Sequence, residues 1–348
     1  MNDSYKFVYL ESYEEIQDNL LKALEKSSCP VEDINEIISG LKDSGFQKVI
    51  FNGYEKFKVF VSVSDLLSKF DKLTNLEIHL SYCNLNQDDL NSLSESLRKI
   101  ISLESLVFSY GSNKISESGA KSILESLITL INLKRLSIDL YENDVIENIL
   151  NSLSESISKL TNLESLKVVL SKNNIGENGM ILLSGSLSKL SNLINLEILL
   201  SSTNIGDNGL KSLSESFLML KNLNNLEINL ACNNIGPNGS KFLSDSLYYM
   251  INLNNLNLYL YGNELGEIGT KTLSESLSNL INLNSLSLEL YENNIGDNGL
   301  RSLTESLSNL NNLNNLNIGL MNNNINQSMF SMMRSVLGNK IGTLNISS

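Results

Sequence analysis

The sequence predicts an α/β array in which short strands alternate with helices at a constant spacing. One leucine recurs every thirty residues in nine copies, without an insertion or a deletion. These leucines are Leu73, Leu103, Leu133, Leu163, Leu193, Leu223, Leu253, Leu283 and Leu313. Each of them begins the same order of elements, an alternating apolar run, a turn and a helical segment. Self-similarity at such a period is typical of a solenoid, in which every copy packs against its neighbours.

Within each copy, apolar residues at every second position predict a short strand. Leu256, Leu258 and Leu260 show this alternation, and we expect them to point into the core. Residues 257, 259 and 261 then belong to the opposite face of the sheet, which is open to a partner. We compare this open face from copy to copy along the rows that contain positions 259 and 261.

The length of 348 residues alone would suggest two domains, but the constant period favours one elongated domain over 46–348. Residues 1–45 lie outside the repeat and read as a helical N-terminal cap. Apolar residues at helical spacing predict helices over 12–27 and 31–43, separated by Cys29-Pro30. The first core layer of a solenoid needs such a cover. A separate helical module that binds a partner is the alternative for this segment.

Two incomplete copies extend the array at its ends. Phe46, Val49 and Phe51 repeat the spacing of the strand residues, which predicts a shortened first repeat over 46–72 with a helix over 63–70. Ile341 and Leu344 reproduce the same spacing after the last full copy. The prediction is therefore about eleven strands.

An asparagine follows most of the strands, and we expect it to be buried. Its positions are Asn113, Asn143, Asn173, Asn233, Asn263, Asn293 and Asn323, with Cys83 and Thr203 at the equivalent places. A buried amide can hydrogen-bond the backbone of its own turn and of the next turn, which predicts a structural ladder. We interpret the recurring serines of the SLSES segments as a solvated helix face or small packing residues.

A pair of glycines comes next in most copies, for example Gly206 and Gly209. We expect the first to allow a sharp turn into the helix, and the second to let helix and strand backbones approach. The helix after Gly209 is predicted to bury Leu210, Leu213 and Phe217. Segments 141–150 and 321–330 lack both glycines but keep their length, so we expect an altered turn in the first and a terminal cap in the second.

This pattern resembles the ribonuclease-inhibitor type of leucine-rich repeat, whose units read LxxLxLxxNxIGxxGxxxLxxxLxxL. The resemblance covers residues 46–348. It implies a right-handed curved solenoid, the leucine-rich repeat horseshoe. Parallel strands would then form the concave face and helices the convex face.

Composition and motifs argue against several classes of function. A formal net charge of −13 disfavours nucleic acid and anionic membranes as partners, since both select clustered Lys and Arg. The three cysteines and the single histidine, His79, form neither a disulfide framework nor a metal-binding pattern. We find no catalytic constellation and expect no enzyme activity, no cofactor and no metal. Without a signal peptide or a run of ~20 apolar residues, the sequence predicts a soluble cytoplasmic protein.

Two functions remain open. The first is a non-enzymatic protein-interaction module or scaffold subunit that binds a protein on its concave face. The resemblance allows such a module to belong to a large cytoskeletal or ciliary assembly. The alternative is a GTPase-activating regulator, because the repeats are also similar to those of the Ran GTPase-activating protein.

Comparing the residues of the open face from copy to copy predicts where a partner of the interaction module would bind. Aromatic and acidic residues gather in two neighbouring copies, at Tyr259, Tyr261, Glu289, Tyr291 and Glu292. Tyrosine is enriched in binding hot spots, and carboxylates select a partner with a basic or mixed surface. A simple packing role for the tyrosines is the competing interpretation. A smaller patch, Asp139, Tyr141 and Glu142, is the reserve candidate.

Overall fold

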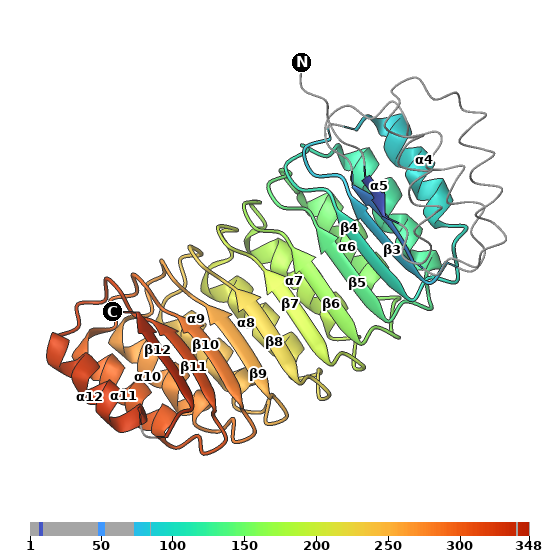
Figure 1. Cartoon of the computed structure of the whole chain (residues 1–348). Coiled ribbons are helices and arrows are strands. Elements are labelled where there is room, and N and C mark those ends of the chain that lie inside the picture. Colours follow the sequence, from blue (N-terminus) through green and yellow to red (C-terminus); the bar gives the residue numbers. More distant parts are fainter. Residues whose placement is uncertain (1–6, 10–47, 53–72, 84, 339, 348) are drawn as a thin grey trace. The chain divides into compact units, whose positions relative to one another are not determined.

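A computed structural model describes residues 7–9, 48–52, 73–83, 85–338 and 340–347 (Figure 1). The predicted helices 12–27, 31–43 and 63–70 lie outside these residues, and so does the boundary between the cap and the array. The chain forms two compact units, Met1–Val168 and Val169–Ser348, which we describe separately.

The first unit is a sheet with helices on one face (Figure 1). Its described strands are β1 (Phe7–Tyr9), β2 (Lys48–Asn52), β3 (Asn75–His79), β4 (Ser105–Ser109), β5 (Arg135–Asp139) and β6 (Ser165–Val169), which ends in the second unit. Its described helices are α4 (Gln87–Leu97), α5 (Glu117–Ser126) and α6 (Glu147–Ile157), with a 3-10 turn η1 (Leu127–Thr129). Strands β2 to β5 are parallel and in the register of the repeat.

The second unit repeats this arrangement (Figure 1). Its described strands are β7 (Asn195–Leu199), β8 (Asn225–Asn229), β9 (Asn255–Tyr259), β10 (Ser285–Glu289), β11 (Asn315–Gly319) and β12 (Thr343–Ser347). Its described helices are α7 (Gly176–Leu187), α8 (Gly206–Phe217), α9 (Pro237–Leu247), α10 (Gly266–Leu277), α11 (Gly296–Ser308) and α12 (Gln327–Leu337). Each strand from β7 to β12 pairs in parallel with the next.

The chain is therefore an α/β leucine-rich repeat solenoid of parallel strands alternating with helices. The register confirms the strands predicted for both incomplete copies, because Val49 of β2 pairs with Leu76 and Leu344 of β12 pairs with Leu316. The curvature and handedness implied by the resemblance stay predictions.

One strand was not expected from the sequence. Residues 7–9 were assigned to a helical cap, but they form β1, which pairs antiparallel with β2 from Phe7 opposite Asn52 to Tyr9 opposite Ile50. Three residues are too few to show an alternating pattern, so this strand cannot be recognised from the sequence. The pairing covers the edge that β2 would otherwise expose.

The core consists of the inward strand residues and the apolar helix positions. In the second unit, Leu226, Leu256 and Leu286 are at most 2% exposed. Leu213 and Phe217 of α8 are buried, whereas Lys211 and Glu215 are exposed, as predicted. Most of the free energy of folding therefore comes from apolar layers shared between neighbouring copies.

The predicted asparagine ladder is present, and it points toward the preceding copy. The amide nitrogen of Asn263 donates to the carbonyl oxygens of Leu230 at 3.0 Å and Leu260 at 2.9 Å. Its amide oxygen accepts from the backbone nitrogens of Asn233 and Ile235, both at 3.0 Å. One side chain thus satisfies four backbone groups that the turn would otherwise leave buried without partners.

The first glycine of the pair has the expected role in most copies. Gly206 has φ +59°, in the left-handed region that favours glycine. Gly236 is an exception with φ −99°, because Pro237 begins α9 one residue later. Segment 141–150 has an altered turn. Asp144 adopts φ 53°, but Ile146 is extended before α6, whereas Gly206 at the equivalent position has a positive φ. This altered turn confirms the expectation for that copy.

The role predicted for the second glycine is wrong. A Cβ atom on Gly299 would lie 2.6 Å from Cγ2 of Ile295 in its own turn and 3.4 Å from Cβ of Thr270 in the preceding helix. A Cβ atom on Gly269 would lie 3.2 Å from Cα of Pro237, again in the preceding helix. These glycines therefore bring helix N-termini together and do not bring helix and strand together.

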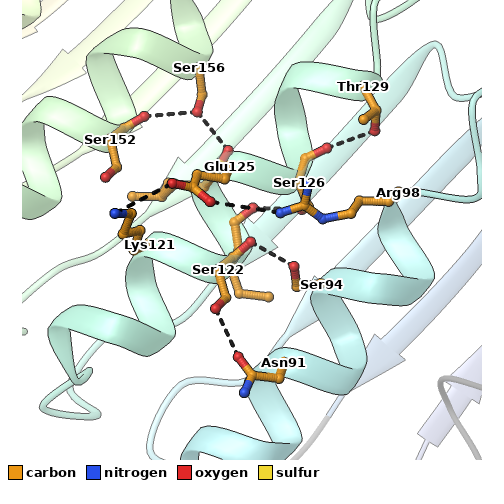
Figure 2. A network of polar contacts seen from close by, with 12 residues as sticks. Asn91, Ser94, Arg98, Lys121, Ser122, Glu125, Ser126, Thr129, Ser152 and Ser156 are labelled. Carbon is orange, nitrogen blue, oxygen red and sulfur yellow. Dashed lines mark hydrogen bonds and ion pairs between the residues drawn. The ribbon is translucent and has the colours of Figure 1, made fainter.

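Buried serines let the helices approach along the rest of their length. Figure 2 shows the first unit, where Ser94 Oγ donates to the carbonyl oxygen of Ser122 at 2.6 Å and Ser156 Oγ donates to that of Leu124 at 2.6 Å. On the surface of these helices, Glu125 lies between Lys121 and Arg98 at 3.7 and 3.9 Å. The buried serines of the SLSES segments are therefore small packing residues, which is one of the two roles predicted for them.

Candidate functional site

The candidate site lies on the open face of the second unit, formed by the strand side chains that alternate with the core residues. In β9 the burial alternates as predicted, with Leu256 and Leu258 buried and Asn257 and Tyr259 half-buried. Half-buried side chains on a rigid parallel sheet keep a fixed spacing, which suits recognition of a partner.

Tyr259 occupies the centre of an acidic group. It pairs in register with Glu289 on β10 and with Asn229 on β8. The pKa of its hydroxyl is raised, first by partial burial and then by the negative charges of Glu227, Glu289 and Glu197. Three carboxylates thus act on one neutral phenol, and this part of the face carries a negative potential.

Tyr291 and Glu289 form the second part of the site. The Glu289 carboxylate is the main cause of the raised pKa of the Tyr291 hydroxyl. The Oε1 atom of Glu289 accepts from Asn317 Nδ2 at 2.9 Å. Gly319 on β11 supplies the space for both residues, since a Cβ atom there would overlap the Glu289 carboxylate and the Tyr291 ring.

The two remaining predicted residues lie on the turns after the strands. Tyr261 is half-buried, and the next residue, Gly262, bonds through its backbone nitrogen to the carbonyl oxygen of Tyr291 at 2.9 Å. Glu292 is exposed and accepts from Asn322 Nδ2 at 3.3 Å. In the described part of the chain, the rings of Tyr259, Tyr261 and Tyr291 form no stacked or edge-on pair with one another. A packing role for the tyrosines stays the competing interpretation.

Two carboxylates of this site were overlooked in the sequence. Glu197 and Glu227 pair in register on β7 and β8, and Glu227 Oε2 accepts from Asn257 Nδ2 at 2.9 Å. They belong to the row that contains position 257, whereas the comparison between copies covered only the rows of positions 259 and 261. The same alternation would have found them. None of the described strands β7 to β12 contains Lys or Arg.

The reserve patch lies in the first unit and is engaged locally. Asp139 Oδ1 accepts from the backbone nitrogen of Tyr141 at 2.9 Å. Glu142 Oε2 accepts from Ser112 Oγ at 3.3 Å. Arg135 on the same strand, β5, adds a positive charge. This patch is therefore less negative than the site around Tyr259.

The structure offers no metal site among the described residues. His79 is 38% exposed on β3, and its Nε2 lies 3.5 Å from Glu77 Oε2. No group of three or more His, Cys, Asp or Glu residues in the described ranges could hold a metal ion. None of the helices described is long and apolar enough to cross a membrane.

The structure of this chain is similar to solved structures of known proteins. The crystal structure of internalin C2 from Listeria monocytogenes aligns over 83% of this chain and 92% of its own, with 15% identity and a TM-score of 0.35. The crystal structure of the yeast Rad7 and Elc1 complex aligns over 96% of this chain and 88% of the matched chain, with 18% identity and a TM-score of 0.48. No protein-family model and no curated protein matches the sequence.

Proposed function

We propose that this chain is a non-enzymatic protein-interaction module of the ribonuclease-inhibitor type. Its partner binds the open face of the second unit through Tyr259, Tyr261, Glu289, Tyr291 and Glu292, together with Glu197 and Glu227. The observation that carries the proposal is the central position of Tyr259 among three carboxylates, on strands without a basic residue.

The charge of this face selects the partner. Carboxylates that are half-buried gain more from a positive partner than fully exposed ones, because the local dielectric constant is lower than that of water. Hydrogen bonds from a guanidinium or ammonium group to a carboxylate are also stronger than neutral ones. The partner therefore presents Arg or Lys, on a basic or mixed protein surface.

The tyrosines supply contact area beside these charges. A tyrosine ring buries a large apolar surface at a small cost in rotamer entropy, and its hydroxyl stays available for a hydrogen bond. Tyrosine hydroxyls are protonated at neutral pH and able to donate, and the raised pKa values of Tyr259 and Tyr291 extend this to higher pH. The tyrosines form the centre of the interface, and the carboxylates give it specificity.

The proposal includes a cytoplasmic location, and it extends to a subunit role in a cytoskeletal or ciliary assembly. The resemblance of the repeats is the support for that extension. For the GTPase-activating alternative, we match no catalytic residue to a position in the part of the chain that the structure describes, and a GTP hydrolysis assay tests it directly.

The experiment is a comparative capture from native extract, followed by affinity measurement with the purified partner. The bait proteins are the wild type, Tyr261→Ala with Tyr291→Ala, and a control with Ile181→Ala and Ile268→Ala, two exposed residues of α7 and α10. We expect a partner that is lost with the first pair only, by ~2 kcal/mol or more of binding free energy. A partner that binds the first pair as tightly as the wild type would refute the proposed site.

A further inference from the structure

A second surface lies where the helices of the second unit end. We name it the helix-end rim, and it comprises segments 188–192, 218–222, 248–252 and 278–282. A second asparagine ladder holds these segments in register, with Asn252 Nδ2 donating to the Lys221 carbonyl oxygen at 3.0 Å and Asn282 Nδ2 to that of Ile251 at 2.9 Å. The side chains of successive segments are therefore adjacent along the rim.

The rim exposes large apolar side chains that the fold does not require. Tyr249 is 64% exposed, Ile251 47% and Ile281 59%, and Met219 and Tyr248 are also about half exposed. Tyr248 and Tyr249 form an edge-on ring pair with centroids 5.3 Å apart. Scattered apolar residues on a surface need no explanation, but a contiguous apolar group marks an interaction site.

A cavity lies within this surface, between the ends of α8 and α9. Its volume is about 190 Å³, and it is lined by Phe217, Leu220, Lys221, Tyr249 and Ile251, among others. Phe217 and Leu220 are core residues, at most 2% exposed, so the floor of the cavity is apolar. A water molecule occupies about 30 Å³ in the liquid. The cavity is therefore large enough to receive one aliphatic or aromatic side chain.

The charge of the rim distinguishes it from the rest of the chain. Its four segments contain Lys189 and Lys221 and no Asp or Glu, in a protein with a net charge of −13. Cations near helix C-termini are favourable for the helix itself, which explains the lysines but not the exposed tyrosines and isoleucines. Lys221 lines the cavity, so a carboxylate next to an inserted side chain would meet an ammonium group.

We propose that the helix-end rim binds an amphipathic segment of a partner protein, with a large apolar residue for the cavity and an Asp or Glu beside it. Apolar anchors in a groove with a charged neighbour are a common way to recognise a peptide helix. This site is independent of the open face, which selects the opposite charge.

The test uses a display library of random peptides, selected on the wild-type protein and depleted on Tyr249→Ser with Ile251→Ser. Both side chains are about half exposed or more, and circular dichroism with a thermal melt checks that the variant is folded. We expect the surviving peptides to combine large apolar residues with Asp or Glu. The absence of any peptide that depends on these residues, or enrichment of Lys and Arg, would overturn the proposal.

Fluorescence anisotropy with a selected peptide then tests the charge. Lys221→Glu, which leaves the apolar residues in place, should weaken binding about tenfold or more. The same variant should bind better when Lys replaces the acidic residue of the peptide, and Tyr261→Ala with Tyr291→Ala should bind the original peptide like the wild type. Unchanged affinity in Lys221→Glu would refute the acidic preference. Rim-dependent binding to phosphatidylserine vesicles, or rim-dependent self-association, would show a different occupant and refute the partner segment.

Discussion

The ring of Tyr291 lies in the space where Gly319, one copy further along the chain, has no side chain. The carboxylate of Glu289 reaches the same space, and it raises the pKa of the Tyr291 hydroxyl. A single missing methyl group on β11 therefore determines how a tyrosine and a carboxylate of β10 and its turn are arranged.

Gly319→Ala should displace both residues and move the Glu289 carboxylate away from the Tyr291 hydroxyl. Because that carboxylate raises the pKa of Tyr291, the tyrosinate absorbance of the variant should titrate at lower pH than in the wild type. Partner affinity should fall as well. Gly185→Ala is the control, since a Cβ atom there meets nothing within 4 Å. An unchanged tyrosine titration in Gly319→Ala would contradict the described geometry.

The strand register predicts opposite outcomes for two adjacent residues on β8. Leu226 is 2% exposed, so Leu226→Asp places a carboxylate in the core and should cost ~4 kcal/mol or more of unfolding free energy. Asn225 is half-buried in a surface ladder, where it donates to Asn195 at 2.6 Å. Asn225→Asp loses that donor and should cost no more than ~1 kcal/mol. Urea denaturation measures both, and similar costs would show that the register is wrong.

The buried ladder predicts a large effect for a small polar side chain. Asn263→Ala removes the partners of four buried backbone groups, and the expected loss is ~3 kcal/mol or more of unfolding free energy. Asn298→Ala on the exposed surface of α11 is the matched control, and its stability should change by less than ~0.5 kcal/mol. Equal melting temperatures for the two variants would contradict a structural role for the ladder.

The connection between Asp297 and Asn326 predicts a dependence on pH. Asp297 Oδ1 accepts from the backbone nitrogen of Asn326 at 2.8 Å, and this bond is the main cause of the lowered pKa of Asp297. A carboxyl group with a lowered pKa in the folded state stabilises the fold above its unfolded pKa. That contribution is lost as the pH falls through the folded pKa.

Denaturation midpoints of the wild type and Asp297→Asn should therefore differ at neutral pH and converge in acid. Glu275→Gln on the surface of α10 controls for the removal of one negative charge. If Asp297→Asn and the wild type differed equally at all pH values, the hydrogen bond would not be the source of the effect.

A Ran-type GTPase should hydrolyse GTP at the same single-turnover rate with and without this protein. The reason is that the proposed function is a non-enzymatic interaction module. The Ran GTPase-activating protein itself serves as the positive control. An acceleration of ~10³ or more would replace the proposed interaction module by the alternative function.

Much of the fold could be predicted because its determinants are local and repeated. A period of two in Leu256, Leu258 and Leu260 identifies both the strand and its buried face, and the constant spacing sets the pairing. The contacts of Gly269 and Gly299 could not be predicted in the same way. Their neighbours belong to the helix of the preceding copy, and the sequence of one copy does not show which surface it meets.

The site was predicted in part for a similar reason. Tyr259 and Glu289 were placed together by register alone, and the structure confirms their pairing. Glu227 acts on Tyr259 from one strand away and Glu197 from two strands away, so their effect becomes visible only when all rows of the face are compared. The helix-end rim was not predicted, because nothing in the sequence distinguishes Tyr249 and Ile251 from other apolar residues at the end of a helix.

The hydrogen bonds of the ladder asparagines limit how the number of copies in such a chain can change during evolution. The side-chain amides of Asn263 and Asn293 bond to their own turn and to the copy before it, through equivalent atoms. Duplicating or deleting thirty residues within the second unit would therefore give every asparagine an equivalent neighbour. Unequal recombination between copies would then lengthen or shorten the gene and keep the hydrogen bonds of every ladder asparagine. An insertion or deletion of any other length would leave one of these amides without its hydrogen-bond partners. The number of copies can therefore change, but only by whole copies of thirty residues.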